Sequence, residues 1–111
     1  MPGPRIAVFA LVLLGAPAAA QHEPDRLDWV SEKCIRYRKA NADALARLGR
    51  QGLGEAFIEA HQRFLDSNCT ARADVCPVSP EEFRMANTLV MAGMNAGMSG
   101  TFFPFACRKK E

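Results

Sequence analysis

The residues with the clearest chemistry in this sequence are its cysteines. There are 4, at Cys34, Cys69, Cys76 and Cys107. None forms a Cys-x-x-Cys pair, which excludes a thioredoxin-type redox site and a c-type haem attachment, and the spacing lacks the close pairs of a structural zinc site. An even number of cysteines in a short exported chain is typical of a disulfide framework, so the sequence predicts two disulfides.

The position of a turn indicates which cysteines pair. Cys34 lies 14 residues before Leu48, and Cys69 lies 14 residues after Glu55, with the turn between two predicted helices near Gln51. Equal distances from the turn of an antiparallel hairpin bring two residues to the same level. We therefore predict Cys34–Cys69 and Cys76–Cys107. The main alternative pairs Cys69 with Cys76 and Cys34 with Cys107.

Methionines suggest a second kind of chemistry. Met91, Met94 and Met98 are spaced to share one face of a helix, and soft thioether ligands select Cu(I). A copper site is thus one hypothesis, and packing in a core or a soft interface is the other. His22, next to the new N-terminus expected after cleavage, adds a weak copper signal. No other cofactor is expected.

Catalytic groups are sparse. The histidines are His22 and His61, and His61 lies at the edge of an apolar helix face, where a packing role is expected. Neither a G-x-S-x-G nor an H-E-x-x-H motif occurs. The adjacent acids Glu81 and Glu82 are accounted for by a helix N-terminus. No catalytic residue is therefore assigned, and an enzyme is the third functional hypothesis.

The first 20 residues have the three-part pattern of a secretory signal peptide. Arg5 is followed by an apolar run, Ile6–Leu14, and then by small residues at Ala18–Ala20. We expect cleavage after Ala20, which leaves a domain of residues 21–111 in the periplasm or secreted. At 111 residues the whole chain has room for one domain, and 14 basic against 12 acidic residues do not suggest a nucleic-acid binder.

Three amphipathic segments must position these residues. Apolar positions recur at helical spacing from about residue 25 to 48 and from 55 to 67, with glycines between. Ser79-Pro80-Glu81-Glu82 predicts a capping box with proline at the first helical position, opening a third helix that ends near Gly97. No segment alternates like a strand. The predicted fold is an all-α, three-helix domain stapled by two disulfides.

Two surfaces suggest partners. The first predicted helix carries a dense set of basic residues: Lys33, Arg36, Arg38, Lys39, Arg47 and Arg50. We interpret them as a solvated helix face. The alternative is that they contact anionic lipid headgroups or an acidic partner. The segment Met85–Cys107 has no charged residue; Gly93 and Gly97 suit close helix packing there, and a membrane span is the less favoured interpretation.

The functional hypothesis from sequence is a small exported, non-enzymatic module that binds or stabilises a protein partner. It rests on the methionine-containing third helix and on Phe102, Phe103 and Phe105, which we expect to supply apolar surface for that partner. The alternative is a periplasmic copper-binding protein that uses Met91, Met94 and Met98.

Overall fold

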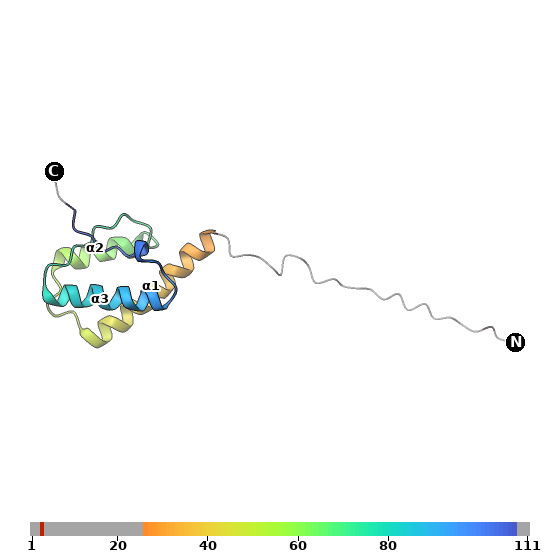
Figure 1. The fold of residues 1–111 in the computed structure, drawn as a ribbon, viewed down its shortest axis with the longest axis horizontal. Helices are drawn as coiled ribbons and strands as arrows, with labels where there is room; N and C mark the ends of the chain where they lie inside the picture. The colour runs from red at the N-terminus through yellow and green to blue at the C-terminus, as the bar shows by residue number, and fades with distance from the viewer. Residues whose placement is uncertain (1–2, 4–25, 109–111) are drawn as a thin grey trace.

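Three helices make up the fold in the computed structural model, which describes Gly3 and residues 26–108 (Figure 1). They are α1 (Arg26–Leu48), α2 (Glu55–Asp66) and α3 (Pro80–Asn95), and a short 3₁₀ turn, η2 (Gly100–Phe102), follows. The described residues contain one isolated parallel bridge, between Val75 and Phe105, and no strand. The all-α prediction is confirmed. Apart from Gly3, the predicted signal peptide lies outside the described residues, as does His22.

The turn between α1 and α2 uses glycine where the chain needs it. Gly49 has φ +75° and its N–H donates to the carbonyl of Leu45, which closes the end of α1. Gly52 has φ +84°, and a side chain there would also overlap that of Glu81. The turn is thereby held against the start of α3.

The predicted capping box is present at the start of α3. The Ser79 hydroxyl accepts a hydrogen bond from the Glu82 N–H at 3.0 Å, and Glu82 accepts one from the Ser79 N–H at 3.2 Å. Glu82 also accepts from the N–H of Gly54, the N-cap of α2, at 2.7 Å. The start of α3 is therefore tied to the start of α2.

Both predicted disulfides are confirmed. Cys34 of α1 is bonded to Cys69, just beyond α2, and Cys76 is bonded to Cys107. The first joins the two arms of the α1–α2 hairpin, and the second joins the loop after α2 to the C-terminal tail. Disulfides of this kind are typical of an oxidising, non-cytoplasmic compartment.

The core is centred on Tyr37 of α1, whose side chain is fully buried. Its ring makes edge contacts with those of Phe64 and Phe102, with centroids 5.5 and 5.6 Å apart. The tail is held beside the loop after α2 because the Val75 N–H donates to Pro104 and its carbonyl accepts from the Ala106 N–H. The tail thus completes the core across α2 and α3.

None of the helices in the described part of the chain is both long and apolar enough to cross a membrane. The uncharged segment Met85–Cys107 is divided between α3, η2 and the tail. Gly97 has φ +93° and follows the end of α3, so this segment does not continue as one helix.

Candidate functional site

The three phenylalanines expected to form a partner surface all pack against the core to some degree. Phe103 is buried, and Phe102 and Phe105 are half-buried against the core. Phe102 also lies beneath the ammonium of Lys33, 5.3 Å from the ring centroid. The β-bridge and the Cys76–Cys107 disulfide hold the tail against the helices, so Phe103 is covered, whereas Phe102 and Phe105 are partly exposed and their role at a partner surface stays a prediction.

The methionine row does not form one helix face. α3 ends at Asn95, and the left-handed Gly97 redirects the chain before Met98. Met98 is consequently buried beside Gly93, whereas Met91 and Met94 of α3 are 68% and 56% exposed. Among the described residues no group of three His, Cys, Asp or Glu side chains is placed to hold a metal ion.

A buried polar pair lies between α1 and α2. The Tyr37 hydroxyl and His61 Nε2 are 2.7 Å apart, and both side chains are buried. The imidazole is also flanked by the rings of Phe57 and Phe105, with centroids 6.1 and 5.9 Å away. This placement confirms that His61 belongs to the packed face of α2.

Burial governs the protonation of this pair. It lowers the pKa of His61 to about 4 and raises the pKa of the Tyr37 hydroxyl, because neither charged form is solvated in the core. Both groups are neutral at pH 7. The pair therefore contributes one buried hydrogen bond and no charge.

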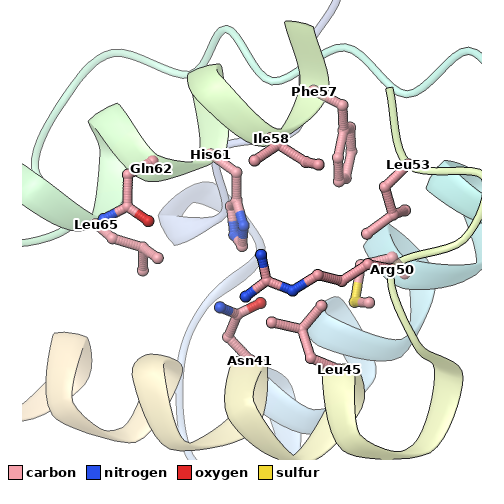
Figure 2. A pocket seen from close by; sticks show the side chains of 10 residues that line it. Asn41, Leu45, Arg50, Leu53, Phe57, Ile58, His61, Gln62 and Leu65 are labelled. Atoms are coloured by element: carbon pink, nitrogen blue, oxygen red, sulfur yellow. The ribbon is translucent and has the colours of Figure 1, made fainter. Parts of the chain in front are cut away.

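A pocket opens beside His61 at the turn end of the α1–α2 hairpin (Figure 2). Figure 2 shows the His61 imidazole, the Arg50 guanidinium and the Asn41 amide pointing toward one another across it. The rest of its lining is apolar apart from Gln62: Leu45, Leu53, Phe57, Ile58, Leu65 and Met85. The pocket thus combines a few convergent polar groups with apolar walls, as ligand sites commonly do.

A groove of different character runs between α1 and α3. Small side chains line it from both sides: Ala40 from α1, Ala92 from α3, and Ala96, which caps the end of α3. Its charged lining comes from α1: Arg36, Lys39, Asp43 and Arg47. The Arg36 guanidinium is already engaged, since it donates to Glu32 and to the carbonyl of Ala96.

The solvent side of α3 is unusually apolar. Phe83, Met91 and Met94 are each at least half exposed and fall on one side of the helix. From Met85 onward no charged residue interrupts this surface. Exposed apolar side chains gathered on one helix face indicate an interaction surface more strongly than scattered ones do.

Sequence reasoning missed the pocket and the groove. Arg50 appears in the sequence as one of six basic residues near α1, and Asn41 as one position on its apolar stripe. The signal that could have identified the pocket is the placement of Asn41 and His61 on the two faces that meet in the predicted hairpin. Arg50 lies in the turn that joins those helices.

No family model, curated protein or solved structure shows significant similarity to this chain.

Proposed function

We propose that this protein is a small exported, non-enzymatic module that binds a protein partner across the groove between α1 and α3. The observation that carries the proposal is the groove itself, with its small-residue lining from α1 and from the C-terminal end of α3. We expect the site of action to be the periplasm or the extracellular space, in agreement with the two disulfides.

The lining of the groove suits a helix of the partner. Ala40, Ala92 and Ala96 have side chains of a single carbon, so another backbone can approach closely. An amphipathic helix laid into an apolar groove is a recurring mode of protein recognition. The partner segment would present its apolar side to these alanines.

Charge selects which helix is accepted. Lys39 and Arg47 are exposed beside the groove, and Asp43 is the one acidic residue in its lining. Neither basic side chain makes an ion pair with another described residue. Acidic residues on the partner would lie opposite these two charges. Such charge pairs would fix the orientation of the partner and raise its association rate more than they would raise its affinity.

The solvent-facing side of α3, on the other side of this helix from Ala92 and Ala96, is a second apolar surface that the same partner would cover. Met91 and Met94 are flexible and polarizable, so they adapt to an apolar partner, and Phe83 is a rigid aromatic side chain that is half exposed. Arg84 lies next to this face and would fall at a polar rim. Apolar contacts of this kind would supply most of the binding free energy.

Binding is favoured over catalysis by the state of the polar groups. The His61 imidazole is buried and its Nε2 is held by Tyr37, so it is poorly placed to exchange protons with a substrate. Glu82, a further buried ionisable group, is engaged by backbone N–H groups. Both groups have a structural role that accounts for them.

A crosslinking experiment in the producing organism tests this function. A photo-reactive amino acid is placed at Met91, with a matched control at Glu59 on the exposed side of α2. We expect one discrete protein adduct from position 91 and none from position 59. The double charge reversal Lys39→Glu and Arg47→Glu should reduce that adduct at least fivefold, and Arg72→Glu should not.

Two outcomes would contradict the groove proposal. Equal adducts from both positions would show collision without a specific surface, and adducts with lipid alone would show a membrane contact in place of a protein.

Mass spectrometry of the same material checks export, for which we expect Gln21 as the first residue. An intact Met1 in the extracytoplasmic pool would contradict cleavage and export. The groove proposal would be unaffected, because the crosslinking data test it separately.

A further inference from the structure

The pocket beside His61 contains a cation without a described counter-ion. Arg50 lines it, and none of the ten lining residues is acidic. The Arg50 guanidinium makes no ion pair and no side-chain hydrogen bond with another described residue, nor does the Asn41 amide donate to one. Unlike Arg36 and Arg38, whose guanidinium groups donate to backbone carbonyls, Arg50 has its full set of donors available.

Arg50 is held in place by its backbone. It lies in the turn closed by Gly49 and Gly52, and its carbonyl accepts from the Leu53 N–H at 3.1 Å. The same turn is anchored to α3 because the Ser79 hydroxyl donates to the Gly52 carbonyl at 2.7 Å. The guanidinium therefore extends from a fixed position at the mouth of the pocket, as Figure 2 shows.

The hydrogen bond to Tyr37 determines what His61 offers to the pocket. The Tyr37 hydroxyl has no other described partner, so it must donate to His61 Nε2 or leave its proton unpaired in the core. A buried unpaired donor is costly, which favours Tyr37 as donor and Nε2 as acceptor. The proton of the neutral imidazole then sits on Nδ1.

The Nδ1–H is available to a ligand. Every fully buried side-chain nitrogen and oxygen of the described residues has a hydrogen-bond partner, whereas Nδ1 has none. It is therefore not sealed in the core, and His61 lines the pocket. Two donor groups thus converge, a charged guanidinium fork and an imidazole N–H, with the Asn41 amide beside them.

We propose that this pocket binds a small monocarboxylate with a short apolar chain. The carboxylate would accept from Arg50 and His61 Nδ1, since a guanidinium fork matches its two oxygens. The chain would lie against the apolar walls of Leu53, Phe57 and Ile58. Nothing in this proposal depends on the groove between α1 and α3.

Size and charge restrict the ligand further. The cavity measures about 70 Å³, which admits about five heavy atoms at 10–15 Å³ each. The site offers a single positive charge, and His61 stays neutral, so a monoanion is better matched than a phosphate dianion. Hexanoate has eight heavy atoms, so its two carboxylate oxygens and about three carbons would fill the cavity and the rest of its chain would extend beyond it; it serves as the probe because its chain is wholly apolar.

Titration of the full oxidised protein with sodium hexanoate, followed by two-dimensional NMR, tests the site. We expect saturable shifts with a millimolar Kd, centred on residues 41, 50 and 61. Arg50→Gln should weaken binding about tenfold, and Arg50→Lys should recover part of it. Arg72→Gln, which removes an exposed arginine outside the pocket, is the control and should leave the Kd unchanged.

Hexanamide separates the carboxylate from the chain. It should bind at least tenfold more weakly than hexanoate. Equal binding of the two compounds, an equal loss in Arg50→Gln and Arg72→Gln, or the absence of saturable shifts would each overturn the proposal. Because Arg50 is exposed, its substitution is expected to leave the fold intact, which the dispersion of the same spectra checks.

Discussion

The Glu82 carboxylate joins the beginnings of two helices through its contact with Gly54. One oxygen accepts from the Gly54 N–H at 2.7 Å, and the other accepts from the N–H groups of Val78 and Ser79. Burial acts to raise the pKa of Glu82, but these three donors outweigh it, so the pKa lies below its ordinary value. One side chain thereby satisfies backbone donors at the starts of both α2 and α3.

Replacing Glu82 is therefore expected to cost more than an ordinary cap. Glu82→Ala should lower the free energy of unfolding by about 3 kcal/mol, because three backbone donors lose a charged acceptor at a buried site. Urea denaturation measures this loss. Glu81→Ala, one position earlier and exposed, is the control and should cost less than about 0.5 kcal/mol. Equal losses would contradict the bridging role.

The buried His61 predicts a pH-dependent stability. In the unfolded chain this imidazole is protonated near its ordinary pKa of 6.5. In the folded chain it stays neutral until the pH falls to about 4. Lowering the pH through this window adds a proton to the unfolded state only, so stability is full above pH 6.5 and falls below it. We expect a loss of about 2 kcal/mol between pH 7.5 and 5.

Urea denaturation at a series of pH values checks this window. His61→Leu removes the titrating group, so its stability should change little between pH 7.5 and 5, whatever its absolute value. Glu82 contributes in a lower range: its depressed pKa gives stability that is lost as the pH falls below about 4.5. A wild-type profile parallel to that of His61→Leu would contradict the assignment to His61.

The ring of Phe103 lies so close to Gly93 that position 93 has no room even for a methyl group. A Cβ at Gly93 would overlap the Phe103 ring. Gly93→Ala should therefore destabilise the protein by about 2 kcal/mol, although alanine is the better helix former. Gly100→Ala, where a Cβ meets nothing within 4 Å, is the matched control and should be near neutral in thermal unfolding.

The disulfides are expected to contribute comparable stability. Removing Cys34–Cys69 or Cys76–Cys107 by paired serine substitution should each cost about 4 kcal/mol on the chain-entropy account, since the loops they close are of similar length. Non-reducing peptide mapping should yield these two pairs. A peptide that links Cys69 to Cys76 would contradict the structure.

Copper binding by the methionine row is expected to be absent from the folded protein. Met98 is buried while Met91 and Met94 face solvent, so the three thioethers do not converge. Cu(I) added under conditions that preserve the disulfides should leave the Tm unchanged, in wild type and in Met94→Leu. A micromolar Kd that Met94→Leu abolishes would establish the copper function in place of this expectation.

Local patterns in the sequence were enough to predict the helices and the pairing of Cys34 with Cys69. The apolar stripe through Cys34 and Tyr37, the capping box at Ser79 and the glycines of the turn each depend on residues close in the chain. Because a helix places residues at known rises and angles, equal distances from the turn were enough to indicate Cys34–Cys69. The burial of His61 followed from the same periodicity.

Only the tertiary structure decided where the tail and the turn place their side chains. In the sequence, Phe102, Phe103 and Phe105 are only apolar residues, which suit a core and an interface equally. In the structure, the bridge between Val75 and Phe105 brings the tail against the core. Met98 leaves the helical row because Gly97 adopts a left-handed conformation that periodicity does not reveal. The pocket of Asn41, Arg50 and His61 likewise joins three segments. Helical spacing relates only neighbours in the chain, whereas these placements depend on how the helices and the tail pack against one another.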